Sequence, residues 1–223
     1  MSRPPGWLVR DAAAVPAGDD WLGPREREVL TGLTVAPRRA DWRLGRWTAK
    51  AAVAAWTGRP PADLEVVAAA DGAPEAWAGE RRLALSVSVS HRAGRAVAAV
   101  CDAPAVVGCD VELVEPRSRA FLREWLSEAE RRAVAAAPDP ALTANLLWTG
   151  KEAAAKVRRE GLRLDVRHAV VRPALPPADG TAWATLAVTL EGREVHGWWR
   201  RDRGHVLSVL CEPAAAGPPV ALD

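Results

Sequence analysis

The sequence predicts an α+β fold made of two similar halves with a ligand site in the cleft between them. A round of helices followed by strands occurs twice along the 223 residues, and the second round starts near residue 104. Apolar residues make up 49% of the chain and the formal net charge is only +2, which indicates a folded protein. No overt repeat accompanies the two rounds, so the prediction of one half over 1–103 and another over 104–223 rests on element order.

The elements of the first half follow from turn residues and hydrophobic periodicity. A proline at the first helical position and a glycine after the last periodic residue delimit a helix. Apolar runs between turn residues predict strands, and the alternation of apolar residues with serines at 83–90 is typical of a half-buried strand. These rules give a short strand at 7–9, helices over 24–30 and 37–56, and strands over 64–69, 83–90 and 96–101.

The same rules define the second half. An apolar strand that ends in acidic residues is followed by a polar turn. Ser127-x-x-Glu130 matches a capping box that opens a helix. The predicted elements are a strand over 105–112, a helix over 118–126, the capped helix, a long helix from about 140 to Gly161, and strands over 165–172, 183–190, 194–201 and 205–212.

Acidic residues on one strand and one helix form the candidate site. Residues two apart in a strand share a face, so Asp110 and Glu112 present two carboxylates to one side while Val111 faces the other. In the long helix, Glu152 and Lys156 lie one turn apart. Three carboxylates around Mg²⁺ with a nearby ammonium form a site for phosphate chemistry.

Each motif also has a structural interpretation. An Asp-x-Glu pair is common on a solvated strand face, and a Glu-Lys pair four apart is usually a surface ion pair. The capping box fully explains Glu130. However, charged residues at the end of a buried strand are rare unless they are paired or bind a metal. The combination of motifs therefore favours a functional site.

Basic residues crowd into one segment, whereas acidic residues are scattered. Arginines at this density suit a polyanionic ligand, although a solvated basic face is the common alternative. His91 ends a strand where a hairpin meets the candidate site, and it is either structural or a donor to a phosphate. The basic residues of the segment are Arg38, Arg39, Arg43, Arg46 and Lys50.

The cysteines and the hydropathy pattern indicate a cellular compartment. Cys101, Cys109 and Cys211 lie in apolar strand-like runs without metal-ligand spacing, so we expect buried thiols. The sequence shows no signal region and no apolar run near the roughly twenty residues that span a bilayer. We therefore expect a cytoplasmic protein with no membrane or nucleic-acid partner.

Several motifs resemble a known family in their order and separation. The individual motifs are short, but their order is fairly specific, and they resemble the 4'-phosphopantetheinyl transferases of the surfactin-synthetase-activating type over roughly residues 25 to 212. The motifs are Gly45-Arg46-Trp47-Thr48-Ala49-Lys50, Ser90-His91, Gly108-Cys109-Asp110-Val111-Glu112, Ser127-x-x-Glu130 and Trp148-x-x-Lys151-Glu152-x-x-x-Lys156.

The resemblance implies a pseudo-twofold monomer that binds coenzyme A and Mg²⁺ in its cleft. Such an enzyme moves the phosphopantetheine arm to a serine of an apo acyl or peptidyl carrier protein and releases 3',5'-ADP. By motif, Asp110, Glu112 and Glu152 would hold Mg²⁺, and Lys156 would neutralise charge on the pyrophosphate. Either Glu152 or Glu130 would accept the serine proton, and the sequence does not choose between them.

The resemblance also implies contacts to coenzyme A. His91 would bind a phosphate of the pyrophosphate, and the basic segment would meet the 3'-phosphate end. The implied catalytic residues are His91, Glu130, Glu152 and Lys156, and the implied coenzyme A contacts are Arg43, Arg46, Lys50, Ser90, His91, Arg92, Lys151 and Lys156.

Two positions depart from the family pattern. Gly72-Ala73-Pro74 stands where the family often has Gly-Lys-Pro or Gly-Arg-Pro, so one cation near the phosphates is missing. Arg92 replaces a small hydroxyl residue after His91, and we hypothesise that it compensates.

Two other functions fit parts of the pattern. A Mg²⁺-dependent nuclease would also use clustered acids and a lysine, but the net charge of +2 gives little support for a basic groove. A coenzyme A or carrier-protein binding module without activity would have no need of the third acid.

Overall fold

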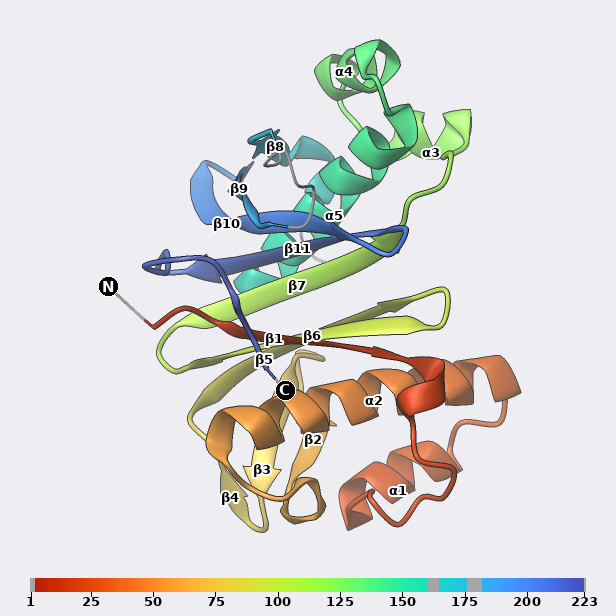
Figure 1. Ribbon diagram of the computed structural model, residues 1–223, viewed down its shortest axis with the longest axis vertical. Coiled ribbons are helices and arrows are strands. Elements are labelled where there is room, and N and C mark those ends of the chain that lie inside the picture. Colours follow the sequence, from red (N-terminus) through yellow and green to blue (C-terminus); the bar gives the residue numbers. More distant parts are fainter. Residues whose placement is uncertain (1–2, 160–164, 176–181, 223) are drawn as a thin grey trace.

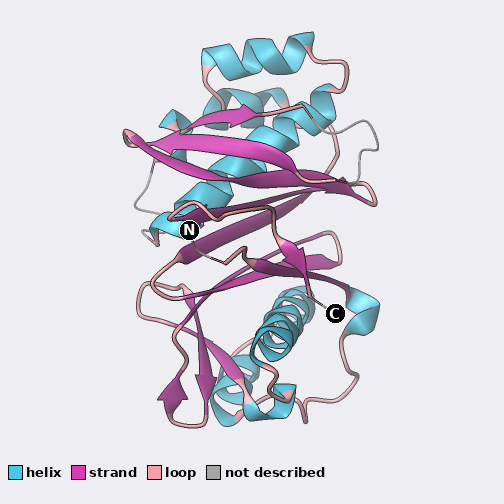
Figure 2. Ribbon diagram, turned by 60° about the vertical axis from the view of Figure 1, so that its left-hand side comes forward, coloured by secondary structure: helices cyan, strands magenta, loops and turns pink. Residues whose placement is uncertain are grey.

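The computed structural model describes residues 3–159, 165–175 and 182–222. Its elements form two groups stacked along the long axis, with a sheet of each group facing the other in the middle (Figure 1). Figure 2 shows the same two groups from a second direction, with a long helix in each. The predicted mixed α+β class is confirmed.

The N-terminal group has a four-stranded sheet in the order β12-β1-β6-β5, a small sheet in the order β2-β3-β4, and two helices. The second helix ends as predicted at Gly58, whose φ of 70° is left-handed. The elements are β1 (Gly6–Asp11), η1 (Ala12–Ala14), α1 (Pro24–Thr31), α2 (Ala36–Thr57), η2 (Pro61–Asp63), β2 (Glu65–Ala68), β3 (Pro74–Ala78), β4 (Arg81–Arg82), β5 (Leu85–Arg92), β6 (Arg95–Asp102) and the C-terminal β12 (Val220–Ala221).

The C-terminal group has a five-stranded sheet in the order β7-β11-β10-β9-β8 and three helices. The predicted capping box is present, with reciprocal hydrogen bonds between Ser127 and Glu130. The elements are β7 (Val106–Leu113), α3 (Arg119–Trp125), α4 (Glu128–Ala136), α5 (Pro140–Arg158), η4 (Val166–His168), β8 (Val170–Pro173), β9 (Ala184–Leu190), β10 (Arg193–Asp202) and β11 (His205–Glu212).

Several segments differ from the sequence prediction, among them the short strand β4 and the 3₁₀ turns η1 and η2, which were not expected. The strand expected over 165–172 begins at Val170, because Asp165 caps a 3₁₀ turn over 166–168. Neither β3 nor β12 was expected, since β3 is short and partly polar and β12 lies in the proline-rich tail. The expected end of the long helix at Gly161 lies outside the described residues.

The two groups repeat one set of buried contacts that the sequence analysis missed. In each group a lysine Nζ donates to a glutamate Oε2 and to a tryptophan carbonyl oxygen, and the same Oε2 accepts an amide N–H three residues before the glutamate. Lysine and glutamate are 24 residues apart in one group and 21 in the other, which hides the repeat from a comparison at fixed period. The matching sequences are Trp21-Leu22-Gly23-x-x-Glu26 with Trp47-Thr48-Ala49-Lys50, and Trp125-Leu126-Ser127-x-x-Glu130 with Trp148-Thr149-Gly150-Lys151.

An apolar layer joins the two sheets. Alternate residues of β7 pack in this layer with residues of β6 and β11, including all three cysteines, which are free thiols. Burial raises the pKa of Cys101 to about 12 and that of Cys109 to about 11. The expected burial of the three thiols is confirmed, and the raised pKa values favour their neutral form.

No helix among the described residues is both long enough and apolar enough to cross a membrane.

Candidate active site

Strand β7 presents its acidic residues on the side that α5 covers. Asp110 lies opposite Ser208 of β11, and the Ser208 hydroxyl lies 2.8 Å from the Thr149 hydroxyl of α5. Val111 packs into the layer between the sheets. The structure thus has the alternation predicted for this strand, with the carboxylates on one side and Val111 on the other.

Helix α5 lies directly against β7 because residue 108 has no side chain. A Cβ atom on Gly108 would lie 2.0 Å from the Ala153 carbonyl oxygen and 2.9 Å from the Val157 amide nitrogen. Only glycine permits so close an approach of helix and strand. The sequence analysis gave Gly108 no role, yet it brings the lysine-bearing helix to the acidic strand.

Lys156 connects α5 to the acidic end of β7. Its Nζ donates to Asp110 Oδ1 at 2.8 Å and to the Cys109 carbonyl oxygen at 2.9 Å. Burial lowers the pKa of Lys156, but the attraction of Asp110 and other acidic neighbours outweighs it, and the net shift is upward. Lys156 therefore carries its positive charge at neutral pH.

The second oxygen of Asp110 lacks a partner. Oδ1 also accepts a hydrogen bond of 2.6 Å from the Ser90 hydroxyl, whereas the buried Oδ2 has no hydrogen-bond partner among the described residues. An unsatisfied carboxylate oxygen at a buried position costs free energy unless a further donor or cation binds it.

Glu152 is destabilised as a carboxylate. Burial and the repulsion of Asp110 and Glu112 raise its pKa, and Lys156 only partly opposes this shift. Within the described parts of the chain, Glu152 has neither a hydrogen bond nor an ion pair to its carboxylate. Three carboxylates that repel one another through space are a set that a divalent cation would stabilise.

Two arginines hold the third acid, Glu112. Arg117 Nη2 lies 2.6 Å and Arg92 Nε 3.3 Å from Glu112 Oε2. Arg117 is itself fixed by a 2.6 Å hydrogen bond from its Nε to Asn145 Oδ1 of α5. As placed, no group of three or more His, Cys, Asp or Glu side chains in the described ranges is close enough together to hold a metal ion.

A large cavity borders this cluster and is lined by both halves. It has a volume of about 920 Å³, at the upper end of the range of ligand pockets. Glu152 and Lys156 contribute to its C-terminal wall, together with Trp125 and Trp148. Strand β5 and the turn at 71–74 form the N-terminal wall.

A smaller cavity adjoins the large one. Its volume is about 160 Å³, and Arg46 and His91 line it. The two cavities share Gly72, Pro74 and Val89 as wall residues. A long ligand could therefore reach from the lysine and the acids to Arg46 and His91.

Arg46 has the features of an anion-binding residue. Its guanidinium stacks on Trp42, 4.8 Å from the ring centroid. Its buried Nε has no hydrogen-bond partner among the described residues, and burial lowers its pKa although Glu26 acts in the opposite direction. An anion in the small cavity would satisfy this guanidinium.

Other candidate residues already have structural partners. Lys50 and Lys151 are fully buried and pair with Glu26 and Glu130 at 2.7 and 2.8 Å. Arg43 donates to the carbonyl oxygens of the preceding loop at 16–18 and pairs with Asp19. These contacts stabilise the fold and do not point into either cavity.

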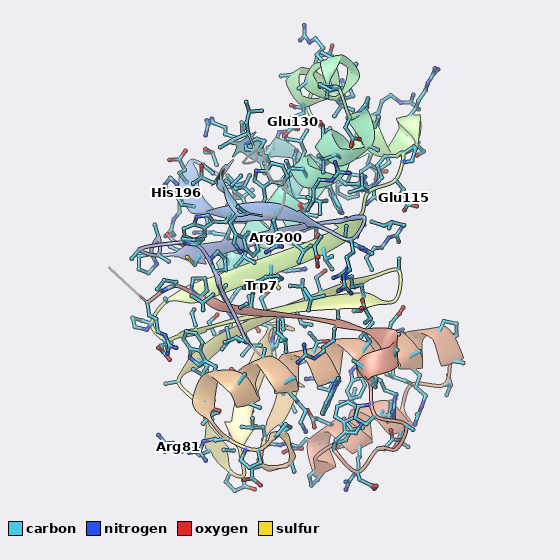
Figure 3. The ribbon with its side chains drawn as sticks, viewed as in Figure 1. Trp7, Arg81, Glu115, Glu130, His196 and Arg200 are labelled. Atoms are coloured by element: carbon cyan, nitrogen blue, oxygen red, sulfur yellow. The ribbon has the colours of Figure 1, made fainter. Side chains whose placement is uncertain are left out.

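Arg92 and Glu130 are not among the wall residues of either cavity. Arg92 donates to Glu115 at 2.6 Å as well as contacting Glu112. Figure 3 shows Glu115 after β7, whereas Glu130 lies with α4 at the end of the molecule remote from α2.

A positively charged partner near that turn escaped the sequence analysis. Arg159 donates through Nε and Nη2 to both carboxylate oxygens of Asp71, at 3.1 and 3.2 Å. Both residues line the large cavity, one from each half. Asp71 and Arg159 are 88 residues apart in the sequence, so no short sequence pattern predicts their contact.

The site combines carboxylates with a charged lysine, side chains that suit the chemistry of phosphate groups. A family model described as ACPS, the 4'-phosphopantetheinyl transferase superfamily, matches residues 106–209. The matched segment contains Asp110, Glu112, Glu152 and Lys156, and it supports a transferase of this general kind. No curated protein matched the chain.

Proposed function

We propose that the protein transfers the 4'-phosphopantetheine arm of coenzyme A to a serine of an apo acyl or peptidyl carrier protein, with Mg²⁺, and releases 3',5'-ADP. The observation that carries this proposal is the ion pair of Asp110 with Lys156, a lysine that together with Glu152 lines a cavity that both halves share. The family match over 106–209 contains all three residues.

The donor set suits Mg²⁺ in its chemistry. Asp110 Oδ2 is buried without a hydrogen-bond partner among the described residues, and burial together with the repulsion of Asp110 and Glu112 raises the pKa of Glu152, so a cation would stabilise both carboxylates. We propose Asp110 and Glu152 as ligands, with Glu112 as a third once its arginine contacts loosen. Mg²⁺ when bound would neutralise charge on the pyrophosphate.

The basic residues of the two cavities would bind the rest of coenzyme A. Lys156 is held by Asp110 and the Cys109 carbonyl, so its ammonium is fixed where the pyrophosphate would lie. Arg46 and His91 line the adjoining cavity, so we propose that both receive the 3'-phosphate end, and that His91 does not bind the pyrophosphate as the family resemblance implied. Lys50 and Lys151, being fully buried in ion pairs, are left out of the proposed binding set.

Glu152 is the proposed general base. The serine oxygen attacks the phosphorus that bears the pantetheine arm, the bond to 3',5'-ADP breaks, and the serine proton passes to a carboxylate. Glu130 Oε2 is occupied by Lys151 and by the Ser127 amide. The N-terminal half has the same pair without a Glu152 counterpart, because Ala51 follows Lys50, which favours a structural role for Glu130.

The type of transferase is also a proposal. The N-terminal half repeats the buried lysine-glutamate arrangement of the matched domain, and it supplies one wall of the cavity within the same chain. We therefore propose the two-half, surfactin-synthetase-activating type, acting as a monomer. The three buried free thiols agree with a reducing cytoplasm.

Mass spectrometry of an apo carrier protein incubated with coenzyme A and Mg²⁺ tests the proposal. The wild-type protein should add one phosphopantetheine group to a serine and release 3',5'-ADP. Asp110→Ala and Glu152→Ala should each lower transfer by at least about 10³-fold while the circular dichroism spectrum stays native.

The double variant Lys50→Met/Glu26→Gln is the control, because it removes a buried acid of the other half together with its partner and leaves no buried charge unpaired. It should retain transfer. If no modification occurs with any carrier protein, or if Asp110→Ala transfers normally at limiting Mg²⁺, the proposal is wrong. Cleavage of nucleic acid instead would identify a nuclease, and binding of coenzyme A without transfer would identify a binding module.

A further inference from the structure

Two edge strands face each other across the middle of the molecule without pairing. Strand β5 is an edge of the N-terminal sheet, and β7 is an edge of the C-terminal sheet. The free edge of a strand presents backbone N–H groups that must find acceptors when they are buried. In this protein the acceptors on β5 are side chains.

Three alternate serines of β5 contact β7. Ser86 Oγ accepts the Val107 N–H at 3.0 Å, and Ser88 Oγ accepts the Cys109 N–H at 2.9 Å. Ser90 Oγ donates to Asp110 Oδ1 at 2.6 Å. The predicted half-buried strand is thus buried at its centre, since Ser88 is only 3% exposed. We call Ser86, Ser88 and Ser90 the serine ladder.

Ser88 of the serine ladder fixes the backbone N–H of Cys109, the residue that precedes Asp110, from the side of β5. Cys109 donates its N–H to Ser88, and its carbonyl oxygen accepts from Lys156 at 2.9 Å. Both backbone groups of the residue that precedes Asp110 are therefore fixed by side chains from two different elements. Ser86 makes the same kind of bond two residues earlier, at Val107, where no acidic residue follows.

We propose that Ser88 is a positioning residue for the Asp110 carboxylate. It acts through the Cys109 peptide group, so that a hydroxyl of the N-terminal half sets the orientation of a metal-binding and lysine-binding acid of the C-terminal half. This inference rests on the proposed function. Groups that orient metal-binding carboxylates typically change metal affinity or activity by 10- to 100-fold when they are removed.

Ser88→Ala and Ser86→Ala form a matched pair of variants. Each removes one hydroxyl that accepts one β7 amide hydrogen, so the two should lower the thermal midpoint by similar amounts. Titration calorimetry with Mg²⁺ alone should show weaker binding by about tenfold for Ser88→Ala, and an affinity within about twofold of wild type for Ser86→Ala. This measurement needs neither coenzyme A nor activity.

Transfer kinetics provide the second readout. Ser88→Ala should lower kcat about tenfold at saturating coenzyme A with little change in KM, whereas Ser86→Ala should leave kcat nearly unchanged. Equal effects of the two variants on Mg²⁺ affinity and kcat would overturn the proposal, because the ladder would then only join the sheets. A rise in KM alone for Ser88→Ala would also overturn it, since that points to direct substrate contact.

Failure of the proposed function gives a different result. In that case the wild-type protein itself shows no transfer, and the comparison of Mg²⁺ affinities between the two variants still decides whether Ser88 positions Asp110.

Discussion

At the scale of single residues, the folded structure disfavours the negative charge of Glu152. Burial and two neighbouring carboxylates raise the pKa of Glu152, so the ionised form is less stable in the folded protein than in the unfolded chain. Such a group persists where its reactivity is needed, because a strained or desolvated site commonly costs stability. Stability and activity should therefore respond in opposite directions when its charge is removed.

Glu152→Gln should abolish transfer and raise the free energy of unfolding by about 1 kcal/mol at neutral pH without Mg²⁺. The sign follows from the raised pKa: the folded state binds the proton more tightly, so Glu152 stabilises the fold when protonated, and this contribution is lost as the pH rises through its shifted pKa. Urea unfolding at neutral pH and at a pH below 4.5, the ordinary glutamate value, measures the effect.

The gain from Glu152→Gln should shrink at the lower pH, because the wild-type side chain is then also neutral. Transfer by the wild-type enzyme should also fall on the acid side as Glu152 becomes protonated, and Mg²⁺ bound to this carboxylate should move that fall to a lower pH than in the metal-free protein. A variant that is less stable than wild type at both pH values would show that Glu152 is not destabilised as a carboxylate.

At the scale of elements, each long helix is fixed to a shorter one by a buried ion pair. Lys151 of α5 pairs with Glu130 of α4, and Lys50 of α2 pairs with Glu26 of α1. Breaking one partner of a buried pair leaves a charge unpaired and costs about 3 to 5 kcal/mol, whereas replacing both with neutral groups is often nearly neutral. Comparing single and double variants therefore distinguishes a loss of activity caused by a destabilised fold from one caused by removal of the catalytic base.

Lys151→Met alone should destabilise the protein by about 3 to 5 kcal/mol, and the double variant Lys151→Met/Glu130→Gln should recover most of that loss. The double variant should also keep transfer within about tenfold of wild type, because Glu152 remains. Chemical denaturation and the carrier-protein assay measure the two effects.

Lys50→Met/Glu26→Gln is the corresponding change in the N-terminal half. Both double variants should behave alike in stability and in transfer. If only the change at Glu130 abolishes transfer in a folded protein, Glu130 rather than Glu152 accepts the serine proton.

Much of the element order was predictable because local signals were strong. Prolines at helix starts, the capping box at Ser127 and the apolar runs of β10 and β11 between turn residues act within a few residues, and the structure has these elements close to their predicted ranges. The convergence of Asp110 with Lys156 required only that a strand and a helix pack together. The structure has that contact, although the catalytic role of the pair stays a prediction.

The rest depended on contacts between distant residues. The buried partners of Lys50 and Lys151 lie 24 and 21 residues away in the sequence. Lys50, which the sequence analysis placed in a ligand-binding basic segment, therefore forms an ion pair in the core instead. The serines of β5 looked like a solvated face because the sequence does not reveal that a second sheet covers them. The requirement for glycine at position 108 becomes apparent only when the position of α5 is known.

At the scale of the whole molecule, the ion pair of Asp71 with Arg159 connects the two halves between wall residues of the large cavity. Asp71 belongs to the turn between β2 and β3, and Arg159 follows α5 with a left-handed φ of 54°. The hydrogen bond from Arg159 lowers the pKa of Asp71, so the pair stays ionised through the neutral and mildly acidic range. Because both side chains are partly exposed, the pair should contribute little to stability and act mainly on access.

Asp71→Ala should therefore leave the thermal midpoint nearly unchanged and speed both the association and the release of coenzyme A, by about two- to tenfold. Stopped-flow measurement of coenzyme A binding checks this. High salt should raise the association and release rates of the wild-type protein toward those of the variant, because salt screens an exposed ion pair. The charge-swapped variant Asp71→Arg/Arg159→Asp keeps an ion pair in reversed order and should restore wild-type rates. Unchanged rates in Asp71→Ala would mean that the pair does not limit the access of coenzyme A to the cavity.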